Sequence, residues 1–95
     1  MKRNPQTIEK VRSKLSAALT GVEGYLADWP KAPKDFTTEA ELQLFVGKLR
    51  EMKSSLDQDE NVPILGLWRI METWPHKNEL RQIIVEAELA YERLK

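Results

Sequence analysis

The chain has 95 residues, enough for one domain (residues 1–95) built around a single hydrophobic core. Its 15 basic and 15 acidic residues cancel to a formal net charge of +0, so its totals do not favour wholesale attraction to nucleic acid or anionic lipid. Without cysteine, disulfides, zinc–thiolate sites and thiol nucleophiles are excluded, and without an apolar run of signal-peptide or membrane-span length we expect a cytoplasmic protein with no membrane contact.

The first predicted helix covers about residues 5–28. Asn4 is a favourable N-cap, and Pro5 suits the first helical position because an N–H there would have no partner. Gly21 and Gly24 each cost a helix interior about 1 kcal/mol relative to Ala, so either the helix ends near Thr20 or both glycines lie on its outer side. We predict one continuous helix, because apolar residues keep the helical spacing through both glycines: Ile8, Val11, Leu15, Ala18, Leu19, Val22, Tyr25, Leu26 and Trp29.

The second predicted helix covers about residues 39–57. Pro30 ends the first helix, and residues 31–35 read as an extended connector. Thr38 and Glu41 have the spacing of a capping box, which places the helix start at about Glu39. The polar stretch 57–61 lacks the glycine and the distal glutamate of a calcium loop and is interpreted as a turn. The apolar seam of this helix consists of Leu42, Phe45, Val46, Leu49, Met52 and Leu56.

The stretch Val62–Pro75 is the densest apolar run and carries two of the three tryptophans. A buried strand competes with a helix here, because a short apolar run cannot be assigned by hydrophobicity alone. We predict a helix over about 62–74, because no other segment offers a partner strand and because the apolar residues share one sector of a helical wheel: Ile64, Leu67, Trp68, Ile70, Met71 and Trp74.

A last helix is predicted over about residues 77–94. Its main stripe is Leu80, Ile83, Ile84, Ala87, Ala90, Tyr91 and Leu94. Mostly short connections make sequence neighbours pack side by side. The predicted fold is therefore all-α, an antiparallel bundle of four helices.

The sequence offers little for catalysis. His76 is the only histidine, with Glu72 and Glu79 nearby, but one histidine without cysteine makes a poor cage for a transition metal. We interpret it as a residue that helps to satisfy the exposed amides of the last helix. The chain lacks a dinucleotide fingerprint, a phosphate-binding lysine loop, a zinc-protease motif and a serine elbow. We therefore expect no cofactor, no metal and no enzymatic activity. Glu86, Glu88 and Glu92 are interpreted as a solvated helix face.

Several apolar residues lie outside the predicted stripes. Val85 and Leu89 lie four positions apart, opposite the main stripe of the last helix. Leu65 falls in the polar sector of the helix predicted over 62–74. Leu44 lies off the apolar seam of the second predicted helix. These four residues predict a partner-binding or self-association face, with Arg69 and Trp74 as anchors at its rim. The alternatives are that the last helix is buried on two sides and that Trp74 belongs to the core.

We therefore expect a small non-enzymatic helical protein that acts through protein–protein binding, as an inhibitor, immunity-type factor or adaptor, with a homodimer as one form of this. The alternative is a nucleic-acid-associated regulator. It would use the basic residues of the N-terminal segment and the start of the first helix, which are Lys2, Arg3, Lys10, Arg12 and Lys14. A salt titration separates the two, because binding to phosphates weakens steeply as salt is added.

Overall fold

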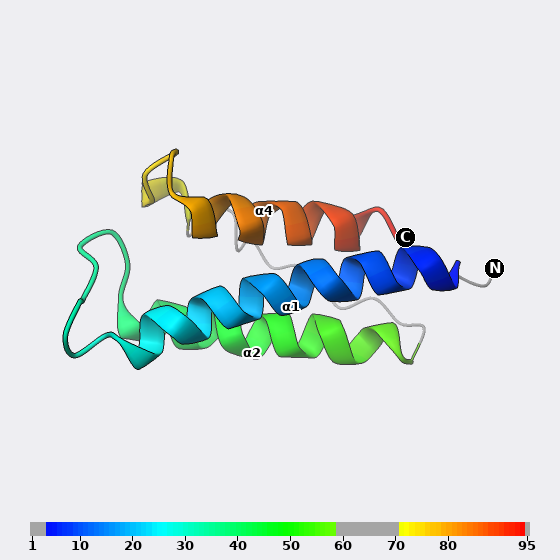
Figure 1. Ribbon diagram of the computed structural model, residues 1–95, viewed down its shortest axis with the longest axis horizontal. Helices are drawn as coiled ribbons and strands as arrows, with labels where there is room; N and C mark the ends of the chain where they lie inside the picture. The colour runs from blue at the N-terminus through cyan, green and yellow to red at the C-terminus, as the bar shows by residue number, and fades with distance from the viewer. Residues whose placement is uncertain (1–3, 59–70, 95) are drawn as a thin grey trace.

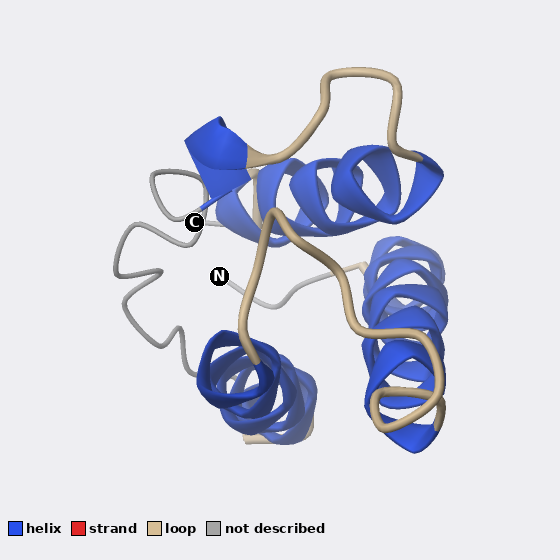
Figure 2. Ribbon diagram, turned by 90° about the vertical axis from the view of Figure 1, so that its left-hand side faces the viewer, coloured by secondary structure: helices blue, strands red, loops and turns tan. Residues whose placement is uncertain are grey.

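The computed structural model describes residues 4–58 and 71–94 of the chain. These ranges form three α-helices, α1 (Pro5–Ala27), α2 (Glu39–Leu56) and α4 (Glu79–Glu92), and a short 3-10 helix, η1 (Met71–Thr73), without any strand. Figure 1 shows α1 running in one direction and both α2 and α4 running in the other. Seen from the end in Figure 2, the three α-helices stand at the corners of a triangle. The prediction of an all-helical fold is confirmed.

The predicted bundle of four helices exceeds the three α-helices of the described residues. The predicted helix over 62–74 falls mostly outside these residues, and its described end, Met71–Thr73, is a 3-10 helix. Trp74 follows it in a bend, because the residue before a proline is sterically pushed out of the helical region. The predicted helices at 5–28, 39–57 and 77–94 correspond to α1, α2 and α4, whose ends differ from the predicted ones by no more than two residues.

The start of each α-helix is fixed by a side-chain cap. The side-chain oxygens of Asn4 and Asn78 accept hydrogen bonds at 2.8 Å from the backbone N–H groups of Gln6 and Arg81, respectively. The Thr38 hydroxyl oxygen accepts one from the Glu41 N–H at 3.1 Å. Each bond satisfies a backbone donor that has no partner within the helix. Asn78 thereby sets the start of α4 at Glu79 rather than at residue 77.

The helix α1 is continuous through both glycines, as predicted. Gly24 is exposed, and a Cβ atom built there would meet open space. Gly21 differs, because a Cβ atom built there would overlap a methyl group of Leu80 on α4. The absence of a side chain at Gly21 therefore lets α4 lie close to α1, so solvent exposure is not the reason for this glycine.

The core lies between the three α-helices and under one end of the bundle. Because α1 packs against both α2 and α4, it is the central helix of the described part. The buried apolar residues are Val11, Leu15, Ala18, Val22, Leu42, Phe45, Leu49, Met52, Leu56, Trp74, Leu80, Ile84, Ala87 and Tyr91. All of them belong to the predicted stripes, since helical periodicity reports which face of a helix is apolar.

Four aromatic rings close one end of the bundle around Trp74. The centroid of the Trp74 ring lies 4.9 Å from that of Phe36, 5.8 Å from that of Phe45 and 6.3 Å from that of Tyr25. The ammonium of Lys34 lies 5.1 Å from the centroid of the Tyr25 ring, within the range of a cation–π interaction. These contacts join the α1–α2 connection and the residue after η1 to both helices.

Candidate protein-binding face

The outer face of α4, away from the core, carries Leu89 and is bordered by Val85. The core side of this helix is occupied by Leu80, Ile84, Ala87, Glu88 and Tyr91. Leu89 is 46% exposed, whereas Val85 is half-buried and packs against the core. Val85 therefore supports the fold as well as bordering the face, and Leu89 supplies most of its free apolar surface.

Leu44 does not extend this face. It is 47% exposed on α2. The hydroxyl oxygens of Ser55 on α2 and Tyr91 on α4 lie 2.6 Å apart, so these two residues share one level of the bundle. Leu44 precedes Ser55 by eleven positions, whereas Leu89 precedes Tyr91 by two, and α2 and α4 run in the same direction (Figure 1). At about 1.5 Å of rise per residue, the two leucines are separated by roughly 13 Å along the bundle.

Trp74 does not join Leu89 either. Trp74 is only 1% exposed and belongs to the core, which is the alternative that the sequence left open beside a role as an anchor at the rim. The physical reason is the aromatic cluster, which surrounds its ring on several sides. Leu65 and Arg69 lie outside the described residues. Ile83, which we placed in the main stripe of the last helix, is 37% exposed because it lies at the edge of that stripe.

The sequence analysis placed Glu88 on a solvated face, but this residue lies in the buried stripe of α4. Its residue surface is only 5% exposed, and its Oε1 atom has no hydrogen-bond partner among the residues that the structure describes. Burial raises the pKa of Glu88 to about 7, and the negative charge of Glu92 adds to this effect. Only its position in the sequence could have predicted this burial, because Glu88 lies one turn after Ile84 and beside Ala87.

A second buried polar contact links α2 to α4. The Ser55 hydroxyl donates to the backbone carbonyl of Met52 at 2.7 Å and lies 2.6 Å from the Tyr91 hydroxyl. A serine hydroxyl has one proton, and Ser55 gives it to Met52, so Tyr91 is the donor in the second bond. Sequence analysis placed Tyr91 in the apolar stripe and gave no role to Ser55, because a serine in a helix has no pattern that reveals its partner.

The basic residues of α1 are largely engaged within the fold. Arg12 donates to Asp57 at 2.8 Å and to Glu9 at 3.0 Å. The hydrogen bond with Asp57, and after it the one with Glu9, raises the pKa of Arg12, while the same contact with Arg12 lowers the pKa of Asp57. The Lys14 ammonium lies 4.0 Å from a carboxylate oxygen of Glu86 on α4. Lys10 is exposed, and Lys2 and Arg3 lie outside the described residues.

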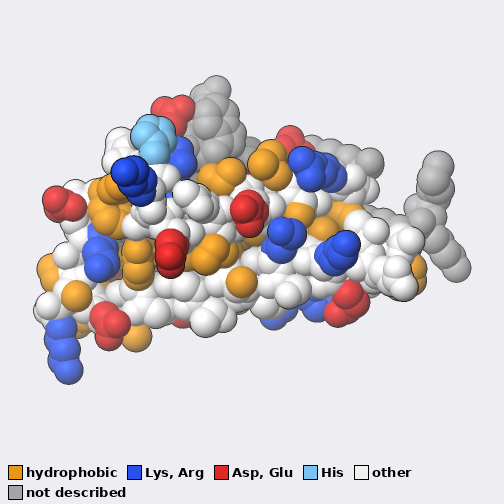
Figure 3. All heavy atoms as spheres, turned by 45° about the horizontal axis from the view of Figure 1, so that its top comes forward, with side chains coloured by type: hydrophobic (Ala, Val, Ile, Leu, Met, Phe, Trp, Pro, Cys, Tyr) orange, Lys and Arg blue, Asp and Glu red, His pale blue; other side chains and the backbone are white. Residues whose placement is uncertain are grey.

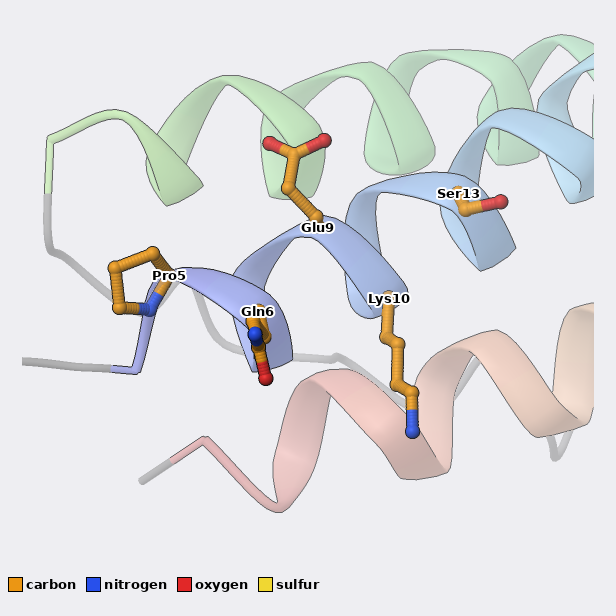
Figure 4. A pocket seen from close by; sticks show the side chains of 5 residues that line it. All are labelled: Pro5, Gln6, Glu9, Lys10 and Ser13. Carbon is orange, nitrogen blue, oxygen red and sulfur yellow. The ribbon is translucent and has the colours of Figure 1, made fainter.

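Two depressions in the described surface have basic side chains at their walls. The first lies along the N-terminal half of α1 and is lined by Pro5, Gln6, Glu9, Lys10 and Ser13 (Figure 4). All five residues are exposed, so it has no buried polar group that would fix a ligand. The second lies between α1 and α2, where Arg12, Leu19, Arg50, Lys53, Ser54 and Asp57 line it. Its arginines are tied to acids, Arg12 to Asp57 and Arg50 to Glu23.

The described residues hold no cluster of three or more His, Cys, Asp or Glu side chains that would bind a metal ion, and His76 is exposed. None of their helices has the length and apolar character required to cross a membrane. On the face shown in Figure 3, apolar side chains emerge as separate areas between charged ones. No protein-family model matches the chain, and neither a curated protein nor a solved structure matches it.

Proposed function

We propose that this chain acts without catalysis, by binding another protein through the outer face of α4. The observation that supports this most is Leu89, which keeps almost half of its surface exposed beside the half-buried Val85, one turn away. Apolar residues at helical spacing on an otherwise polar face are the usual anchors when a helix docks into a partner's groove. Inhibitors, immunity-type factors and adaptors act in this way, and self-association into a homodimer would use the same face.

The size of this face limits the kind of complex we propose. Two apolar side chains fall well short of the roughly 1,200–2,000 Å² that stable interfaces bury in total, so the expected complex is weak or transient unless the partner covers more of the chain. Exposed Glu86 and Glu92 lie one turn on either side of Leu89 and would form its polar rim.

The test compares two leucines with equal exposure. A photoreactive amino acid is placed at position 89 in one variant and at position 44 in another, and each is irradiated in its host cells. We expect a discrete cross-linked product from position 89 that is absent from position 44. Mass spectrometry then shows whether the partner is a second copy of the chain or a different protein. Equal products at the two positions, or none at position 89, would contradict the proposal.

A second comparison measures the contribution of Leu89 to binding. Leu89→Lys should weaken self-association in sedimentation, or retention of the cross-linked partner, whereas Leu44→Lys adds the same charge at a site of equal exposure and should not. The far-UV circular dichroism of both variants should match that of the natural chain. The nucleic-acid alternative stays a prediction; steep loss of binding with added salt would favour it, because contacts with Leu89 depend little on ionic strength.

A further inference from the structure

Glu88 is the one acidic side chain that lies within the buried part of the described residues. Its residue surface is 5% exposed, and it lies on the same side of α4 as Ile84 and Tyr91, each of which is fully buried. A carboxylate in such a place loses its hydration, and ionised carboxylates are found in protein interiors only when they are paired or well hydrogen-bonded. Neither condition holds for Oε1 of Glu88 among the described residues.

The charges on the described residues do not compensate for this burial. On α4 itself, Glu92 lies one turn further along and carries a charge of the same sign, and Arg81 lies two turns earlier, about 10 Å along the helix axis. From α1, the ammonium of Lys14 approaches Glu86 instead. At 100° per residue, Glu86 points about 160° away from Glu88 around the helix. From α2, the group that reaches α4 is the uncharged Ser55 hydroxyl, at Tyr91.

We propose that Glu88 is a pH-sensitive element of this fold: its carboxyl group is protonated while α4 is packed, and loss of the proton loosens the packing of α4. Burying the neutral acid in apolar surroundings costs much less desolvation free energy than burying the anion. The anion, in contrast, would draw water to the buried side of α4 or turn that side outward. The same helix carries the proposed binding face, but this inference stands on the burial of Glu88 and does not depend on that function.

The sign of the pH dependence follows from the two states of the carboxyl group. Its pKa rises from an ordinary value of 4.5 to about 7 in the folded chain. The folded chain therefore keeps a proton that the unfolded chain releases between these two values, so unfolding is favoured as the pH rises. Below about pH 4.5 both states hold the proton, and above about pH 7 both have lost it, so the effect is confined to this window.

The experiment is urea unfolding of the full chain at a series of pH values, with Glu88→Gln as the variant that cannot ionise. Between about pH 4.5 and 7, the ratio of the folding equilibrium constant of the natural chain to that of the variant should fall about tenfold per pH unit. All other ionisable groups are common to both proteins, so the ratio cancels their contribution. A flat ratio over this window would overturn the proposal.

Two further variants serve as controls. Glu88→Leu removes the polar atoms and should flatten the pH dependence in the same way, even if the buried amide of the glutamine variant is poorly accommodated. Glu92→Gln should move the titration of Glu88 to lower pH, because it removes the neighbouring negative charge that helps to raise the pKa of Glu88. Glu86→Gln, an exposed acid on the same helix, should leave that titration unchanged.

Direct measurements on the natural chain keep the proposal testable even if every variant folds poorly. The carboxyl carbon of Glu88, followed by nuclear magnetic resonance, should titrate well above the ordinary value of 4.5, near 7; titration near 4.5 would overturn the proposal. Hydrogen-exchange protection should fall in α4 relative to α1 and α2 as the pH rises through 7. Uniform loss in all three helices would show that the carboxyl affects global stability without acting on α4, which contradicts the proposal.

Discussion

The helices α2 and α4 both pack on α1, but different contacts hold them there. α2 has 18 residues and buries five large apolar side chains. Two ion pairs join it and its C-cap Asp57 to α1, Arg12 with Asp57 at 2.8 Å and Arg50 with Glu23 at 2.9 Å. α4 has 14 residues, and the ion pair that the described part of the chain shows between it and α1, Lys14 with Glu86, is longer, at 4.0 Å. Its buried stripe also contains a carboxyl group without a partner for Oε1 among the described residues.

This difference indicates which part of the molecule can change at the smallest free-energy cost. Exposed ion pairs contribute little to stability, so the advantage of α2 lies mainly in its longer apolar seam. α4 has a shorter seam and depends on a close approach at Gly21. Elements with fewer buried apolar contacts open locally at lower free energy than the rest of a fold. We therefore expect α4 to be the more easily released helix, and it also carries the proposed binding face.

The largest effect is expected from Phe45→Ala in α2. Phe45 is fully buried and packs edge-on against Trp74, with 5.8 Å between ring centroids. Its truncation should lower the free energy of unfolding by about 3–5 kcal/mol, and Ile84→Ala in α4 by about 2–5 kcal/mol. Urea unfolding at pH 5 measures both. Leu44→Ala, at the exposed neighbour of Phe45, should change the stability by less than about 0.5 kcal/mol. A larger loss from Ile84 than from Phe45 would reverse the comparison between the two helices.

Particular residues show how far the sequence determines this fold. Asn4 and Thr38 predicted helix starts correctly, because a cap is a local interaction between neighbours in the sequence. Gly21 was ambiguous because the reason for it, Leu80, lies 59 positions further along the chain. Glu88 was misassigned because polarity predicts exposure, and only the packed structure shows a polar residue at the edge of a buried stripe. The separation of Leu44 from Leu89 likewise depends on how the helices align.

An intermediate effect is expected from the two glycines of α1, which form a matched pair. Gly24→Ala should stabilise the chain by up to about 1 kcal/mol, because alanine favours the helix and its methyl group would meet open space. Gly21→Ala gains the same propensity, but its methyl group would overlap Leu80, so we expect a net loss of about 1 kcal/mol or more. Thermal unfolding compares the two variants.

A third variant shows whether the Gly21 effect arises at the contact with α4. In a Leu80→Ala background the overlap is absent, and Gly21→Ala should then stabilise the chain as Gly24→Ala does. If Gly21→Ala is equally harmful with and without Leu80, the close approach of α4 is not its cause. The contact at Gly21 would then no longer distinguish the packing of α4 on α1 from that of α2.

The smallest of these effects concerns the hydrogen bond that joins α2 to α4 directly. Tyr91 donates to Ser55, which in turn donates to the Met52 carbonyl, so both protons are used inside the protein. Tyr91→Phe leaves the bond from Ser55 to Met52 in place, and we expect a loss of about 0.5–1.5 kcal/mol. A double-mutant cycle with Ser55→Ala isolates the pair, and its coupling energy should fall in the same range. A coupling near zero would mean that α2 and α4 are held only through α1, so that release of α4 would leave α2 unaffected. A coupling above about 2 kcal/mol would tie the two helices into one cooperative unit, and the selective loosening of α4 with pH would then spread to α2.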